Sequence, residues 1–517
     1  MLGPLNLING TVVSSGGANA AFQAYCLKAS VTSGGSSSIS TVGGNNNGIH
    51  LNENSFVVTG GTLTVSAPMI NKIGGTSTGF VKTGNGVMVM TSDNMFSGDV
   101  TVSNSILQVG NGGSAGTLGT GVGNVRLVNA DASLIFNRSG STGVSGTISG
   151  NGSFIKKGLG SVTLSGSNTY VGETLISNGV LAVTTTNSLP GFATAGKVVL
   201  SSGAGLSVGV GRWSVADINA LIDTGIYGSD TYFGFDTTAG NYTYSGLFAL
   251  PNVAGIVKTG PYVLKLPTDT GCAGRVTALS GILQADFGSG LPAETNLVLA
   301  GGSYSSASGS VATPLGTDGA QITFASGTAS GFSAVDMPLT VNLGGAGDSL
   351  LWGSAVFNPS ALVLNEIGAN TNLTFVNGLT LNGATRTINV NATGSGAAAQ
   401  IDGVLANGSG TAGLVKGGNG ILRLTAANTF TGVTTVNAGT LALTGGDNRL
   451  STNSSITINA GILDLGGGFQ NIPVGTFYMN NGAVVQNGDI RYRNASWGPG
   501  GAANVTFGVG EIGRAHV

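Results

Sequence analysis

The sequence predicts an all-β fold, a right-handed parallel β-helix (solenoid) in which short strands wind around a central core. Three observations support this prediction. Glycine accounts for 92 of the 517 residues, far above the ~7% of an average protein. A segment of roughly thirty residues recurs with a fixed internal register. Within each copy, apolar and polar residues alternate, which is typical of half-buried strands.

The composition narrows the classes of function. Charged residues make up 8% of the chain and the net charge is −2, so there is no basic footprint for nucleic acid. Hydrophobic residues make up 41%, too many for a disordered chain. No run of apolar residues is long enough to predict a membrane-spanning helix. Cys26 and Cys272 lie far apart in the sequence, and we expect both to be unpaired apolar residues.

The repeat is clearest at residues 79–109, 152–183, 254–285 and 412–443. Each copy contains a lysine that is followed, sixteen positions later, by a glycine. The lysines are Lys82, Lys156, Lys258 and Lys416, and the glycines are Gly98, Gly172, Gly274 and Gly432. Four matches without a gap indicate a true repeat.

Three short strands are predicted in each copy from the period-two pattern. In the fourth copy, for example, Leu422 and Leu424 flank the polar Arg423. The residues predicted to point inward are Met88, Met90, Val100, Val102, Leu107 and Val109; Val162, Leu164, Thr174, Ile176, Leu181 and Val183; Leu264, Leu266, Val276, Ala278, Leu283 and Ala285; and Leu422, Leu424, Thr434, Val436, Leu441 and Leu443.

Glycine, asparagine and an aromatic residue mark the turns. We expect positive φ at the glycines two positions after each lysine, which are Gly84, Gly158, Gly260 and Gly418. Asparagine tolerates left-handed backbone and bonds its own turn, which would explain Asn94, Asn168 and Asn428. Phe96, Tyr170 and Phe430 follow and are expected to fill the core. The third copy is degraded, with Pro261, Tyr262, Thr270 and Cys272 at these turns.

Such small units cannot bury an apolar face alone, so the copies are expected to stack. Weaker half-copies begin at Gly61, Gly123, Thr371 and Ser454. The sequence therefore predicts a single solenoid array over residues 1–510. A β-sandwich would also show alternation, but it would not require a recurring register.

Residues 211–248 break the repeat and are predicted to form an insertion that protrudes from the solenoid wall. Ser214 and Asp217 resemble a helix-capping box, and an apolar stripe follows at helical spacing, predicting a helix of about two turns. The favoured interpretation is a loop with a small hydrophobic cap. The alternative is a binding surface with exposed Tyr232, Tyr242 and Tyr244.

The repeat resembles the autotransporter-associated β-strand repeat of exported bacterial proteins. The resemblance rests on Lys416-Gly417-Gly418-Asn419-Gly420, Asn428-Thr429-Phe430-Thr431-Gly432 and Asn437-Ala438-Gly439-Thr440-Leu441. It implies a cell-surface or extracellular, outer-membrane-associated passenger stalk for adhesion or display, and the residues themselves favour a chain without catalytic activity. Host surfaces, polysaccharides or neighbouring cells are the implied partners, and export machinery or an anchor is expected outside these residues.

No motif for catalysis, cofactor binding or metal binding emerges from the sequence. The Lys-x-Gly-x-Gly turns lack the order of a phosphate-binding loop, because the lysine precedes the glycines and a strand follows. His50 is the only credible catalytic histidine, and we expect it to be a lone exposed residue. The acidic residues Asp93, Asp99, Glu173 and Asp269 fall at turns of the repeat. A carbohydrate-active β-helix enzyme remains the alternative.

Metal binding is also not favoured. Asp223, Asp230 and Asp236 lie within the predicted insertion, but they lack EF-hand spacing. The final residues 511–517, EIGRAHV, differ in character from the rest and include His516. We interpret them as a non-native tail on a fragment of a longer protein.

Overall fold

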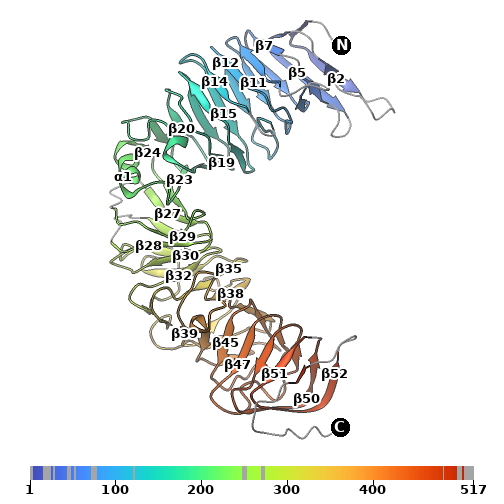
Figure 1. The fold of residues 1–517 in the computed structure, drawn as a ribbon, viewed down its shortest axis with the longest axis vertical. Helices are drawn as coiled ribbons and strands as arrows, with labels where there is room; N and C mark the ends of the chain where they lie inside the picture. Colours follow the sequence, from blue (N-terminus) through green and yellow to red (C-terminus); the bar gives the residue numbers. More distant parts are fainter. Residues whose placement is uncertain are drawn as a thin grey trace. The chain divides into compact units, whose positions relative to one another are not determined.

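The computed structural model describes residues 4–15, 25–26, 30–42, 48–51, 54–71, 78–119, 123–246, 253–268, 274–480, 482–497 and 504–505. Within these residues the protein is a parallel β-solenoid with one α-helix, α1 (Val215–Thr224), and two 3₁₀ turns, η1 (Thr186–Ser188) and η2 (Ser395–Ala397) (Figure 1). The prediction of an all-β parallel β-helix is confirmed. Asp269, Thr270, Cys272 and the tail 511–517 lie outside the described residues.

Two compact units divide the chain, and each is described by itself. Unit 1 comprises Met1–Gly234 and Phe248–Ala254, and unit 2 comprises Phe235–Leu247 and Gly255–Val517. The chain passes between them within β25 (Thr231–Asp236) and β27 (Val253–Thr259).

Unit 1 is built from parallel sheets in which each strand pairs with the strand one turn away. The seven-stranded sheet contains β1 (Leu5–Ile8), β4 (Val31–Gly34), β7 (Asn54–Val58), β10 (Phe80–Thr83), β12 (Val100–Ser103), β14 (Val125–Leu127) and β17 (Ile148–Gly150). The ten-stranded sheet contains β2 (Thr11–Ser15), β5 (Ser36–Val42), β8 (Thr62–Val65), β11 (Val87–Met90), β13 (Ile106–Val109), β15 (Ser133–Asn137), β18 (Ser153–Lys157), β20 (Thr174–Ile176), β22 (Val198–Leu200) and β24 (Ile226–Tyr227). A three-stranded sheet contains β3 (Tyr25–Cys26), β6 (Ile49–His50) and β9 (Met69–Ile70), and the nine-stranded sheet begins with β16 (Thr142–Val144), β19 (Ser161–Leu164), β21 (Val180–Val183) and β23 (Gly205–Gly209).

Unit 2 has the same construction. The nine-stranded sheet ends with β29 (Arg275–Ala278), β31 (Asn296–Leu299) and β34 (Gln321–Phe324). The twelve-stranded sheet contains β26 (Tyr242–Thr243), β28 (Val263–Leu266), β30 (Ile282–Ala285), β32 (Ser303–Ser305), β35 (Ala329–Phe332), β38 (Ala361–Leu364), β41 (Arg386–Asn389), β44 (Leu414–Gly417), β46 (Thr434–Val436), β48 (Ile456–Ile458), β50 (Phe469–Met479) and β52 (Asp489–Trp497). Another sheet contains β33 (Ser310–Val311), β36 (Leu339–Val341), β39 (Leu373–Phe375), β42 (Ala399–Ile401), β45 (Ile421–Leu424), β47 (Thr440–Leu443), β49 (Ile462–Asp464), β51 (Val484–Gln486) and β53 (Asn504–Val505). A three-stranded sheet contains β37 (Leu350–Leu351), β40 (Leu379–Thr380) and β43 (Leu405–Ala406).

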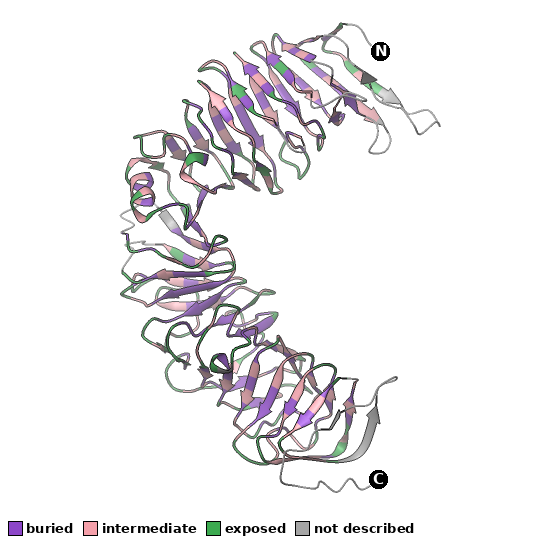
Figure 2. Ribbon diagram, viewed as in Figure 1, coloured by how far each residue is buried: buried purple, intermediate pink, exposed green. Residues whose placement is uncertain are grey.

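The core lies inside the coils, where the inward residue of each strand stacks on its counterpart one turn away. Buried and half-buried residues alternate along the strands (Figure 2). In β45, Leu422 and Leu424 are fully buried, whereas Arg423 between them is half-buried. All the residues predicted to point inward are buried, including the hydroxyl-bearing Thr174 and Thr434.

A copy of the repeat contributes four strands, one more than the pattern predicts. The segment that carries the lysine is itself a strand, and in the fourth copy it is β44, which pairs with β46. The next strand, β45, pairs with β47. Each copy therefore spans two consecutive turns of the solenoid, and the second turn stacks on the first.

Successive copies do not lie in the same sheet. In unit 1, Lys82 is in the seven-stranded sheet and Lys156 is in the ten-stranded sheet. In unit 2, Lys258 is in the nine-stranded sheet and Lys416 is in the twelve-stranded sheet. The segments between the copies do not make a whole number of turns, so the register within a copy does not determine its position around the coil.

The glycine turns have the predicted geometry. Gly418 has φ +71°, and Gly84, Gly158 and Gly260 also lie in the left-handed region. A Cβ at Gly418 would lie 2.3 Å from the carbonyl oxygen of Val390 on the preceding turn. Two features therefore require glycine at this position: its left-handed backbone conformation and the close approach of two turns.

Helix α1 begins with the predicted capping box. The Ser214 hydroxyl accepts a hydrogen bond from the Asp217 amide at 3.1 Å, and the Asp217 carboxylate accepts one from the Ser214 amide at 3.0 Å. The helix has 10 residues, longer than the predicted two turns, and buries Ile218, Leu221 and Ile222. The rest of the predicted insertion 211–248 contains β24, β25 and β26, which belong to the sheets; residues 247–248 lie outside the described part.

Candidate functional site

The repeated lysines are fully buried, and each holds a turn together through its ammonium group. In the sequence they are recognisable only by their fixed spacing to a glycine sixteen positions later. In the fourth copy, Lys416 Nζ donates to the carbonyl oxygens of Gly417 at 2.8 Å and Gly418 at 2.7 Å, and to Ala438 of the next turn at 3.1 Å. The ammonium therefore fills a cage of backbone carbonyls that belong to two turns.

The same cage recurs in the other copies, including the degraded one. Lys156 Nζ donates to the carbonyls of Lys157, Gly158 and Asn178 at 2.7, 2.8 and 3.0 Å. Lys258 Nζ donates to the carbonyls of Thr259, Gly260 and Ser280 and to the Thr237 hydroxyl. Lys82 Nζ donates to the carbonyls of Thr83, Gly84 and Gly86 and contacts the Ser105 hydroxyl.

Burial shifts the acid–base equilibrium of these ammonium groups. Loss of hydration disfavours the charged form, which lowers the pKa of Lys82, Lys156 and Lys416 from 10.5 to about 8. Burial lowers the pKa of Lys258 further, to about 7, although the nearby Asp236 acts in the opposite direction. A sequence signal for this burial exists, because each lysine stands two positions after an inward apolar residue, such as Leu414 before Lys416.

The repeated asparagines also connect neighbouring turns. Asn428 Oδ1 accepts a hydrogen bond from the Leu405 amide of the preceding turn at 2.8 Å, and its Nδ2 donates to the Arg449 carbonyl of the next turn at 2.8 Å. Asn94 and Asn168 make equivalent bridges. None of these three described residues has positive φ. The expected left-handed backbone is therefore wrong, and the amide is required because it carries both a donor and an acceptor.

His50 contacts the backbone of a neighbouring turn. It is half-buried in β6, and its Nδ1 lies 2.8 Å from the Asn71 carbonyl oxygen of a neighbouring turn. No group of three or more His, Cys, Asp or Glu side chains that could hold a metal ion occurs among the residues described. The histidine thus takes part in coil stacking, and the expectation that it is exposed is wrong.

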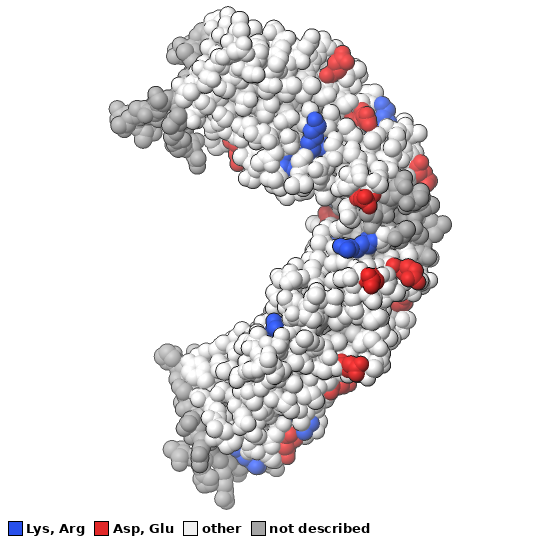
Figure 3. Space-filling view, turned by 180° about the vertical axis from the view of Figure 1, so that it is seen from behind, with Lys and Arg blue, Asp and Glu red and all other residues white. Residues whose placement is uncertain are grey.

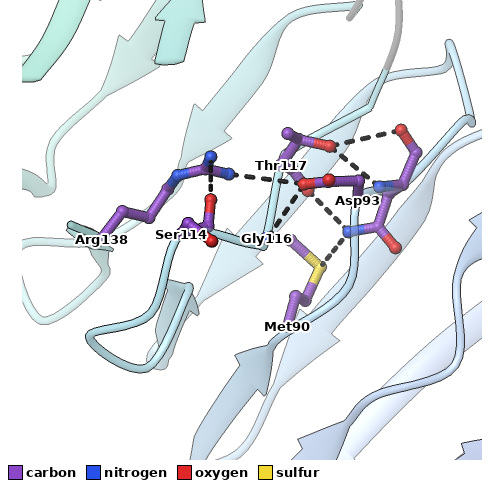
Figure 4. Close-up of polar contacts among 7 residues, drawn as sticks. Met90, Asp93, Ser114, Gly116, Thr117 and Arg138 are labelled. Carbon is purple, nitrogen blue, oxygen red and sulfur yellow. Dashed lines mark hydrogen bonds and ion pairs between the residues drawn. The ribbon is translucent and has the colours of Figure 1, made fainter. Parts of the chain in front are cut away.

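Two of the acidic residues named from the sequence cap turns. Asp93 Oδ1 accepts a hydrogen bond from the Gly116 amide at 3.0 Å and lies 3.5 Å from Nη1 of the buried Arg138 (Figure 4). Arg138 also donates to the Ser114 carbonyl, so both side chains hold the loop that contains Ser114 and Gly116. Asp99 Oδ1 accepts from the Asn124 amide at 2.6 Å.

The residues named in the predicted insertion differ in their surroundings. Asp236 Oδ1 accepts from the Thr238 amide at 3.0 Å within its own turn. Tyr244 is fully buried and packs against Phe235, with ring centroids 5.2 Å apart. Tyr232, in contrast, is 39% exposed. The three tyrosines therefore do not form one exposed group.

Comparison with known proteins identifies the repeat that contains these polar residues. The family model described as the passenger-associated-transport-repeat matches residues 80–109, 154–183 and 414–443. These segments coincide with the first, second and fourth copies and contain Lys82, Lys156 and Lys416. The chain carries three passenger-associated-transport repeats.

A relative of this passenger-repeat chain is the Adhesin BmaC autotransporter of Brucella suis biovar 1 (strain 1330). The two are 28% identical over 352 residues, which are 65% of this chain and 8% of the adhesin. The chain thus spans a small part of the length of this relative. No solved structure matches the chain. The repeat family implies an extracellular or cell-surface, outer-membrane-associated location.

The surface of the passenger-repeat chain carries few charges, and they are scattered on the face shown in Figure 3. Only two ion pairs occur among the residues described, Arg138–Asp93 and Lys265–Asp336. None of the described helices is both long and apolar enough to cross a membrane. The polar residues that recur most regularly are directed inward and join the turns.

Proposed function

We propose that this chain is a non-catalytic passenger segment that presents an extended β-helical surface for adhesion or surface display. The observation that carries this proposal is the inward use of the repeated polar residues. Lysine and asparagine recur because they bind backbone groups of neighbouring turns, as Lys416 and Asn428 do. The repeat thereby builds a stable scaffold and leaves the outer wall free to vary.

Two further observations support a binding role over catalysis. The acidic side chains Asp93, Asp99 and Asp236 each accept hydrogen bonds from backbone amides near a turn. General acid–base chemistry requires paired ionisable groups that face a substrate, and these carboxylates are occupied in supporting the backbone. The similarity to a protein named an adhesin points in the same direction.

The proposal is tested by coating beads with the chain and measuring their retention on cultured epithelial cells, immobilised polysaccharide and bacterial cells. We expect retention on at least one surface, without release of reducing sugar from the polysaccharide. The matched control is the variant Leu424→Asp, which is expected to lose the fold. Release of reducing sugar, or equal retention of native and unfolded chains, would contradict the proposal.

A further inference from the structure

We propose that a second copy of this chain docks on the outer face of the ten-stranded sheet in unit 1. The docking surface is an aliphatic row formed by Ile155 of β18, Leu175 of β20, Val199 of β22 and Ile226 of β24. The proposal concerns self-association, and it goes beyond the proposed display function.

These four residues form a continuous column on four consecutive strands of the sheet. Ile155 pairs in register with Leu175, Leu175 with Val199, and Val199 with Ile226. The first three are half-buried between fully buried neighbours on their own strands, and Ile226 is 54% exposed. They therefore occupy the outward positions of the sheet.

Outward aliphatic residues also occur on other strands, but in shorter runs: Ile421 of β45 and Ile462 of β49 are separated by Thr440 of β47. The corresponding outward residues of β19 and β46 are Thr163 and Thr435, which are half-buried like the members of the row. A stack of four outward aliphatic side chains leaves a strip of apolar surface on this sheet, and the column continues to Ile135 of β15, which pairs with Ile155 and is buried. Contiguous exposed apolar strips mark interaction sites.

At one place the chain covers a pair of outward aliphatic residues with its own segments. In unit 2, Val263 and Ile282 pair on the outer side of β28 and β30, and both are buried. Val335 and Ala369, from later turns, pack against them. The segment that contains Val335 and Asp336 is held in place by two contacts. Gln284 Nε2 donates to the Val335 carbonyl at 3.0 Å, and Lys265 forms an ion pair with Asp336. The outer face is thus able to bind an apolar layer.

The charges beside the aliphatic row select a second copy as the occupant. Glu173 directly precedes β20 and Lys197 directly precedes β22, so opposite charges lie at the same edge of adjacent strands. Lys197 Nζ donates to the Val171 carbonyl at 2.7 Å. Among the ion pairs of the described residues, none involves Glu173 or Lys197.

A two-fold axis parallel to the strands, midway between β20 and β22, would bring the apolar residues of two copies together and would also pair their opposite charges. Rotation about this axis places Leu175 opposite Val199 of the second copy and Ile155 opposite its Ile226. The same rotation places Glu173 opposite Lys197 of the second copy, and Lys197 opposite its Glu173. Such an isologous contact is self-complementary and closes at two copies.

The contact is small. Strands are spaced about 4.8 Å apart, so four strands extend over roughly 15 Å. A single strip of this length buries less surface than a standard specific interface, so we expect a weak, concentration-dependent dimer whose affinity falls as salt screens the charged pairs.

Sedimentation velocity of the full chain over a range of concentrations tests the proposal. We expect a monomer–dimer equilibrium whose dissociation constant rises about tenfold or more in Leu175→Thr, because a buried leucine contributes strongly to an apolar contact. The matched control is Val298→Thr, at an outward, half-buried position of β31 in unit 2. It should associate like the native chain, and circular dichroism should show that both variants are folded.

Charge exchange tests the two-fold geometry. Glu173→Lys and Lys197→Glu should each weaken self-association, whereas an equimolar mixture of the two variants should restore it by pairing unlike copies. The double variant, with both charges exchanged, should also self-associate. A folded native chain that stays monomeric at all concentrations, a dimer insensitive to Leu175→Thr, or single variants that are not rescued by mixing would overturn the proposal.

Discussion

The ammonium nitrogen of Lys416 lies 3.1 Å from the carbonyl oxygen of Ala438, a residue 22 positions later and one turn further along the solenoid. The lysine ammonium thus supplies a hydrogen bond to a carbonyl that is shielded from water. An equivalent contact joins Lys156 to Asn178 and Lys258 to Ser280. Because the contact links consecutive turns, it stabilises their stacking as well as the turn itself.

Replacement of Lys156 by methionine should destabilise unit 1. The substitution keeps the apolar stem but leaves the carbonyls of Lys157, Gly158 and Asn178 without their donor. Buried acceptors without partners cost about 1–3 kcal/mol each, so the three carbonyls together predict a loss of at least about 3 kcal/mol in urea unfolding. Lys157 is exposed and adjacent in sequence, and Lys157→Met is the matched control. Equal effects of the two substitutions would show that the cage contributes nothing.

Stability should rise with pH between about 8 and 10.5. In the folded chain the four caged lysines have a pKa of about 7 to 8, below the value of 10.5 for an unfolded chain. In this window the unfolded state binds more protons, so raising the pH favours the folded state. The urea midpoint should increase across this range, and the increase should be smaller in Lys258→Met. A midpoint that falls with pH in the native chain would contradict the lowered pKa.

Asn428→Ala should weaken the stacking of three turns. Its side chain bonds the Leu405 amide on one side and the Arg449 carbonyl on the other. The Leu405 amide loses its partner when the side chain is removed, whereas the Arg449 carbonyl still accepts from the Asn428 backbone amide at 2.9 Å. A decrease of about 1–3 kcal/mol is expected. Asn419 is exposed, and Asn419→Ala should change stability by less than about 0.5 kcal/mol. Hydrogen exchange should show faster exchange of the Leu405 amide in Asn428→Ala alone.

Leu424→Asp should unfold or strongly destabilise the fourth copy. Leu424 is fully buried, and a carboxylate there would be removed from water without a partner, at a cost of more than about 4 kcal/mol. The neighbouring Arg423 points outward, so Arg423→Ala is the control and should alter stability by less than about 1 kcal/mol. A melting temperature in Leu424→Asp equal to that of the control would refute the inward orientation.

Period-two patterns were sufficient to predict which side chains enter the core. Leu422 and Leu424 could be assigned to the inside and Arg423 to the outside, because strand geometry directs alternate residues to opposite faces. The positive φ of Gly418 was likewise predictable from its place in a recurring turn. These are local properties, and they depend on a few adjacent residues.

Contacts between turns could not be read in this way. Lys416 appears in the sequence as a polar residue before a turn, and its burial depends on the Ala438 carbonyl that the next turn supplies. The role of Asn428 was misassigned for the same reason, because its partners Leu405 and Arg449 are more than twenty residues away. The aliphatic row from Ile155 to Ile226 was also missed, since its members are adjacent only through strand register.

The repeat, the strand pattern, the glycine turns and the class of fold can be predicted from the amino-acid sequence alone, because these depend on steric preferences and on alternating burial within about thirty residues. The folded chain is needed to see which sheet each copy enters, how Lys416 and Asn428 are paired, and which outward residues form a continuous surface. These features depend on residues one turn apart, which a solenoid joins through backbone hydrogen bonds. The turn length, set by the loops between the strands, therefore selects every partner.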